Sequence, residues 1–289
     1  MFLIGMTAID INYVAHGDVP ASVKKEISEI TSDCYKKFGD RVPYKVEVHV
    51  FDSEDNLNNF LKQEKFKLGI TTGSFDEALP CRYDALRGFP RLLIPLDRIS
   101  HYSKLARAGA IRHEAAHTVL HGGLEYNIFH IPEDCRHTAL VKGIDTEKLE
   151  ETFIQLTMGI KDLEATRLLI QHDFIHCQFA FALEWIRPSE EDKLAWSVAK
   201  TSRQTRFVYE SALIRPLLFA NPLLSLPQSK KVPVEEQLQL GARIEKMIAI
   251  LGETEEDKVL QVAAAIIEAI TEDTHNNIDT AFHQLMKLI

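Results

Sequence analysis

Hydrophobic and polar positions follow two different periods in the first hundred residues. Alternation of period two marks the strands, most clearly in YKVEVHVFDS, where Val46, Val48 and Val50 fall on one side. Helical spacing follows Pro20 and the polar, acidic segment that begins at Ser53. The segment PRLLIPL carries two prolines, which favour the edge of a sheet. The predicted strands cover residues 9–14, 44–52 and 90–96, and the predicted helices cover residues 20–39 and 53–66. Residues 68–90 predict irregular structure or short hairpin strands.

Beyond about residue 100 the helical period dominates. A helix is predicted to run from there to the Gly122-Gly123 pair, which is a typical helix end. A polar stretch (124–145) follows, and the proline-rich residues 221–234 predict a linker. Further helices are predicted over 146–158, 160–187 and 190–220, with two or three more in 235–289. The prediction is an α+β fold: an amino-terminal half with a small mixed sheet, then an all-helical carboxy-terminal half. The predicted domains are residues 1–125, 126–225 and 235–289.

Composition and charge argue against several kinds of partner and location. The formal net charge is -9, which offers no general attraction for nucleic acid or anionic lipid. The four cysteines are widely spaced, so neither a disulfide framework nor a thiolate zinc site is expected. The apolar opening segment lacks the basic residues of a signal peptide, and no apolar run approaches the roughly 20 residues of a membrane span. We expect a cytoplasmic protein with no nucleic-acid or membrane partner; the oligomeric state stays open.

The sequence HEAAH, residues 113–117, carries the clearest chemistry. Residues four apart lie on one face of a helix, about 6 Å apart, so His113 and His117 can bind one Zn²⁺. Glu114 would then stand where a carboxylate can take a proton from a metal-activated water. His121 lies one turn further, too far along the helix to join both histidines at one ion. It is expected to contact a ligand or the substrate, or to be a histidine favoured at the end of a helix.

A third ligand must come from another part of the chain. Glu164 is the preferred candidate, followed by Asp162 and then by Glu150 or Glu151. Asp162 and Glu164 point in different directions around a helix, so only one of them can face the metal.

With these residues, the chain resembles a zincin metallopeptidase of the gluzincin type. The resemblance implies a zincin-like amino-terminal half, Zn²⁺ bound by His113, His117 and Glu164, and Glu114 as general base. It also implies that the edge strand PRLLIPL pairs with an extended peptide or protein substrate. The chain departs from the family at position 168, where Leu replaces an acidic residue that orients a zinc histidine, and alignment of DLEAT with an ExxAD signature would make Asp162 the ligand. Leu120 and Gly123 stand where metzincins carry Gly and His, which excludes that class.

Other candidates come from the helical half. His172 and His176 form a second pair four residues apart, which could line the substrate cleft or bind another metal, although histidines packed in the core are the more common case. His176, Arg203, Arg206 and Tyr209 could each stabilise an oxyanion. The sequence thus predicts a zinc-dependent hydrolase, most simply a peptidase. The alternatives are an inactive zincin-fold protein with structural zinc and a partner-binding helical module, or a helical interaction protein without metal.

Overall fold

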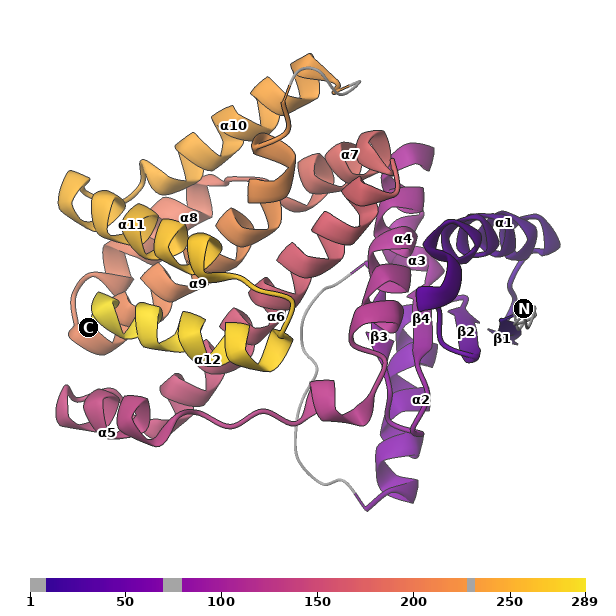
Figure 1. Cartoon of the computed structure of the whole chain (residues 1–289), viewed down its shortest axis with the longest axis horizontal. Helices are drawn as coiled ribbons and strands as arrows, with labels where there is room; N and C mark the ends of the chain where they lie inside the picture. Colours follow the sequence, from indigo (N-terminus) through magenta and orange to yellow (C-terminus); the bar gives the residue numbers. More distant parts are fainter. Residues whose placement is uncertain (1–8, 70–79, 228–231) are drawn as a thin grey trace, which may run out of the picture. The chain divides into compact units, whose positions relative to one another are not determined.

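The computed structural model describes residues 9–69, 80–227 and 232–289 and forms two compact units (Figure 1). The first unit comprises residues 1–127 and 172–181, and the second comprises residues 128–171 and 182–289. The first unit thus includes residues 172–181, which lie inside the predicted domain 126–225. Residues 235–289 belong to the second unit, together with the helices that precede them.

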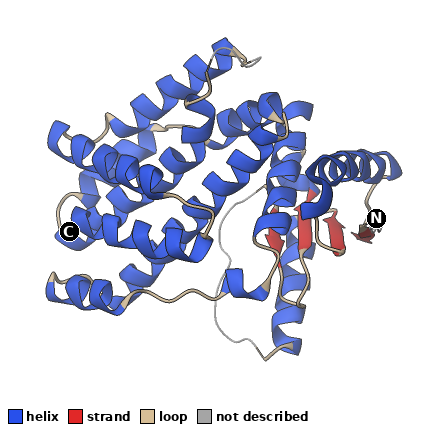
Figure 2. Cartoon of the chain, in the orientation of Figure 1, coloured by secondary structure: helices blue, strands red, loops and turns tan. Residues whose placement is uncertain are grey.

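A four-stranded mixed sheet organises the first unit (Figure 2). Its strands are β1 (Asp10–His16), β2 (Lys45–Phe51), β3 (Arg82–Asp84) and β4 (Arg91–Pro95), arranged in the order β1-β2-β4-β3. β1, β2 and β4 are parallel, and β3 is antiparallel to β4. The α+β class expected from the hydrophobic pattern is therefore confirmed for the described residues.

The structure corrects one expectation about this sheet. β4 is not an edge strand, because it pairs with β2 on one side and β3 on the other, so the edge beyond it is β3. β2 is buried on both faces: Glu47 and His49 are buried as well as the valines that alternate with them. A strand inside a parallel sheet is covered on both faces, so polar side chains on it need hydrogen-bond partners. Here Glu47 and His49 are partners for each other, with His49 Nε2 3.1 Å from Glu47 Oε2.

Helices pack on this sheet and on one another. Their bounds in the first unit are α1 (Ala21–Phe38), η1 (Gly39–Arg41), α2 (Glu54–Lys67), α3 (Leu96–Ile99), α4 (Lys104–Leu120) and η2 (Leu124–Asn127). α2 covers one face through Leu57 and Leu61, which pack with Phe51 and Leu93. α4 packs against α1 and against β3 and β4. Tyr35 of α1 and Thr118 of α4 share a buried hydrogen bond of 2.9 Å, which fixes the two helices side by side.

The second unit is helical throughout its described residues. It contains α5 (Glu133–Val141), α6 (Thr146–Gln171), α8 (Glu190–Ala199), α9 (Arg203–Leu224), α10 (Val234–Ile248), α11 (Glu253–Ala269), α12 (Thr274–Leu285) and η3 (Met286–Leu288). α7 (Ile175–Trp185) begins in the first unit and ends in the second. α6 and α9 form the most extensive helix pair of this unit. Among the described residues, no helix is both long enough and apolar enough to cross a membrane.

Several helix boundaries differ from the expected ones. The expected break between residues 158 and 160 does not exist, because α6 runs unbroken to Gln171. The expected helix 160–187 is instead interrupted after Gln171, where Asp173 adopts a left-handed backbone with φ 64°. The polar stretch after α4 contains the unforeseen helix α5, and α9 continues through Pro216 and Pro222 into the expected linker. Residues 70–79 of the expected hairpin region and residues 228–231 of the expected linker lie outside the described residues.

Candidate metal centre

Helix α4 carries the HEAAH sequence in a buried setting. The Ser103 side chain caps its amino terminus by accepting a hydrogen bond from the Ala106 amide. Close packing is possible because Gly109 has no side chain: a Cβ atom there would lie 2.1 Å from the Cys177 carbonyl oxygen of α7. Only 3% of His113 and 3% of His117 are exposed, so both imidazoles are withdrawn from bulk water. The sequence thus places two potential ligands on one buried helical face.

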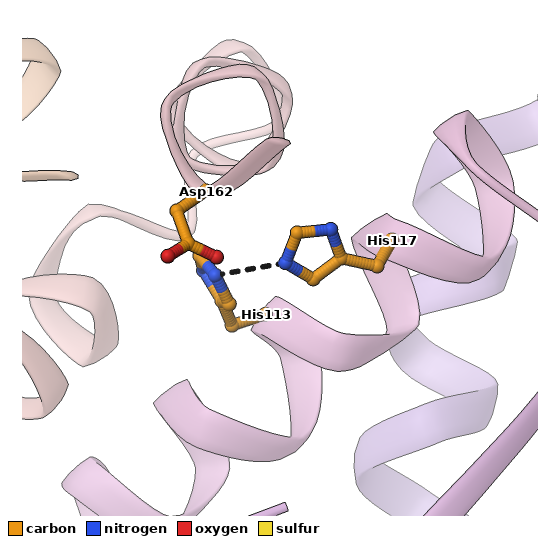
Figure 3. Close-up of side chains that lie close together, drawn as sticks. All are labelled: His113, His117 and Asp162. Carbon is orange, nitrogen blue, oxygen red and sulfur yellow. Dashed lines mark hydrogen bonds between the residues drawn. The ribbon is translucent and has the colours of Figure 1, made fainter. Parts of the chain in front are cut away.

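The geometry of the two imidazoles suits one metal ion. Their Nε2 atoms lie 3.1 Å apart, as the dashed line in Figure 3 shows. If both nitrogens lie at the usual 2.0–2.1 Å from zinc, this separation gives an N–Zn–N angle of about 100°, close to the tetrahedral value. The two histidines therefore fit a zinc ion without rearrangement of the helix.

A third histidine orients the second of these ligands. His121 is fully buried, and its Nδ1 lies 3.1 Å from Nδ1 of His117. When His117 donates its Nδ1 proton to His121, its Nε2 keeps the lone pair that a metal requires. Tyr83 of β3 stacks on the other side, with ring centroids of Tyr83 and His117 4.7 Å apart and planes 10° from parallel. His121 and Tyr83 thus both contact His117, and the sequence offered no signal for Tyr83.

The carboxylate of Glu114 is also buried, with 8% of the residue exposed. Its negative charge acts on Cys81, which precedes β3, and on Arg82, the first residue of β3. It adds to the effect of burial in raising the pKa of the Cys81 thiol. It also partly counteracts burial and the neighbouring Arg98, which lower the pKa of Arg82. Glu114 therefore lies in an electrostatic environment shared with an arginine of the edge strand.

Two carboxylates of α6 behave differently. Glu164 Oε2 accepts a hydrogen bond of 2.8 Å from Thr274, and Glu164 Oε1 accepts one of 2.7 Å from Asn277. Both donors lie in the first turn of α12, so Glu164 holds that helix to α6. Asp162 points elsewhere: its Oδ2 accepts a 2.9 Å hydrogen bond from Nε of the buried Arg215 on α9.

Asp162, like the two histidines, is a buried potential metal ligand. Figure 3 draws the three candidate ligands His113, His117 and Asp162, each of which is buried. The opposite directions of Asp162 and Glu164 follow from their positions on the helix. Because Thr274 and Asn277 hold Glu164 within the second unit, Asp162 is the carboxylate that enters the proposal below. Glu150 and Glu151 are exposed.

The remaining candidates have other contacts. His172 lies in the turn after α6 and packs edge-on against Phe38, whereas His176 is exposed in the first turn of α7, so the expected helical pair does not form. The hydroxyl of Tyr209 donates to the Asp192 carbonyl at 3.0 Å. Arg206 lies 3.8 Å from Glu210 in the second unit.

Arg203 likewise contacts the Lys142 carbonyl within the second unit. Arg215, which holds Asp162, is the residue that sequence reasoning missed; its only signal is a charge inside the apolar run SALIRPLLF.

Comparison of the chain with protein-family models, curated proteins and solved structures finds no match.

Proposed function

We propose that this chain is a zinc-dependent hydrolase that acts on peptides. His113, His117 and Asp162 would hold the metal, and Glu114 would be the general base. The observation that carries this proposal is the pair of buried Nε2 atoms 3.1 Å apart on a helix that also carries a buried glutamate next to the first histidine. The order of strands and helices before α4, with an antiparallel strand at one edge, supports a zincin-like first unit.

Each residue has a distinct role in this proposal. A bound zinc ion supplies Lewis acidity and lowers the pKa of a coordinated water. The Glu114 carboxylate accepts a proton from the attacking water and passes it to the nitrogen of the leaving amine. His121 keeps His117 in the tautomer that binds metal, and Arg215 orients the Asp162 carboxylate through its hydrogen bond.

The edge strand supports an extended peptide as the proposed substrate class. β3 is the edge of the sheet next to α4, and an extended peptide can add to such an edge through main-chain hydrogen bonds. Tyr83 of β3 stacks on a zinc histidine, which brings this edge close to the proposed ligands. We therefore transfer to β3 the substrate-pairing role that the sequence suggested for PRLLIPL.

The first test combines metal analysis with a peptide-cleavage assay. Wild type should bind zinc and cleave members of a mixed peptide library, and His117→Ala should lose both properties at this site. Glu114→Gln should keep the zinc and lose cleavage, whereas Glu125→Gln, an exposed acid beyond the end of the same helix, should keep both.

Two results would count against the proposal. Full cleavage by Glu114→Gln would remove the general base. If wild type binds zinc but cleaves no peptide, the site is a structural zinc site and the chain is not a peptidase.

A further inference from the structure

The second unit contains another group of potential metal ligands. Asp134 and Cys135 lie in the first turn of α5, and His283 lies near the end of α12. One oxygen, the sulfur and one ring nitrogen of these residues all lie within 4.8 Å of one another. Cys135 is buried, whereas Asp134 and His283 are exposed, so the thiol lies beneath two side chains that can move.

Hydrogen bonding fixes which nitrogen of His283 is available. Its Nδ1 lies 2.7 Å from the carbonyl oxygen of Asp279, which can only accept, so Nδ1 carries a proton. Its Nε2 lies 2.9 Å from Asp134 Oδ2. The lone pair of Nε2 therefore faces a carboxylate oxygen, and a cation is needed between these two acceptors. A second proton is one such cation and a metal ion is another.

The surroundings add negative charge. Burial, followed by the carboxylates of Asp134 and Asp279, raises the pKa of the Cys135 thiol to about 11. A metal ion must therefore displace the thiol proton to solvent, and the resulting thiolate and the Asp134 carboxylate together balance a divalent charge. A carbonyl oxygen that orients a histidine, as Asp279 does here, is the usual outer partner of a metal-binding imidazole.

We propose that Asp134, Cys135 and His283 form a second metal site, distinct from the HEAAH site, that ties α5 to α12. One sulfur, one nitrogen and one oxygen ligand suit a borderline divalent ion such as Zn²⁺, with water in the fourth position on the exposed side. The three ligands come from two helices of the second unit, so a bound ion would link α5 to α12. This site does not depend on the proposed hydrolase activity.

Cobalt titration of the metal-free full-length chain tests this site, because Co²⁺ bound to thiolate has a charge-transfer absorption in the near ultraviolet. Wild type and His117→Ala should both show this absorption, which should saturate at one equivalent in His117→Ala. Cys135→Ser and His283→Gln should each abolish it. His137→Gln, an exposed histidine on the same helix α5, should leave it unchanged.

Two results would overturn the proposal. One is the absence of thiolate-to-cobalt absorption in His117→Ala. The other is its persistence in Cys135→Ser or in His283→Gln, with folding of the His283→Gln variant checked by circular dichroism.

Discussion

Asp162 has a structural role that can be measured without any metal. Its Oδ2 and Nε of Arg215 are 2.9 Å apart, and both side chains are about nine-tenths buried. Asp162→Asn would leave the Arg215 charge buried without its counter-charge. Breaking a buried ion pair in this way costs about 3–5 kcal/mol. In contrast, Glu164→Gln removes one charge from a half-buried hydrogen-bonded group and should cost about 1 kcal/mol.

The assay is equilibrium unfolding in urea with a chelator present, so that metal binding does not contribute. Arg215→Met should also destabilise the chain, and Asp162→Asn combined with Arg215→Met should be more stable than the sum of the two single losses. The reasoning is refuted if Asp162→Asn costs less than about 1 kcal/mol, or if the two substitutions are additive.

Three further predictions concern other residues. His121→Phe should weaken zinc binding about 10- to 100-fold in a metal-competition titration, because the second zinc histidine loses the acceptor that fixes its tautomer. Gly109→Ala should lower the free energy of unfolding in urea by about 1–3 kcal/mol, because the new Cβ would meet the Cys177 carbonyl oxygen of α7. Gly241→Ala is the control and should not destabilise the chain, because the nearest atom outside its own helix, among the described residues, lies 3.9 Å from its Cβ. Burial raises the pKa of Glu210 to about 7, so the folded chain holds a proton there that the unfolded chain releases above pH 4.5. The free energy of unfolding should therefore fall, by up to about 3 kcal/mol, as pH rises from 4.5 to 7. Glu210→Gln should remove this dependence in unfolding experiments at a series of pH values.

Local patterns were sufficient for the elements that lead to the site. The alternation in YKVEVHVFDS, the cap at Ser53 and the glycines after α4 predicted β2, α2 and the end of the HEAAH helix correctly. These features depend on neighbours in the sequence, which is why the sequence reveals them. His113 and His117 share a helical face for the same reason, and their approach to 3.1 Å follows from their spacing.

Features that depend on distant neighbours were not predictable. The two prolines of PRLLIPL suggested an edge, yet β3 covers β4, because Pro90 precedes the strand and Pro95 ends it. α9 tolerates Pro222 because Leu223 and other residues around it are packed in the core of the second unit. The chain turns after Gln171 at Asp173, without glycine or proline to mark the break.

The choice between Asp162 and Glu164 also depends on residues that are distant in the sequence. Both are acidic residues on one helix, and only the positions of Arg215, Thr274 and Asn277 show which carboxylate turns toward α9 and which toward α12. These partners lie more than fifty residues away in the sequence. A buried arginine within an apolar run is the one sequence feature that could have indicated a buried carboxylate partner.

Anomalous diffraction at the zinc absorption edge, from crystals of the zinc-loaded full-length chain, tests the metal site most directly. The account predicts an anomalous peak about 2.0–2.2 Å from His113 Nε2, His117 Nε2 and a carboxylate oxygen of Asp162. The absence of a peak at the two histidines, or a peak whose carboxylate ligand is Glu164, would contradict it.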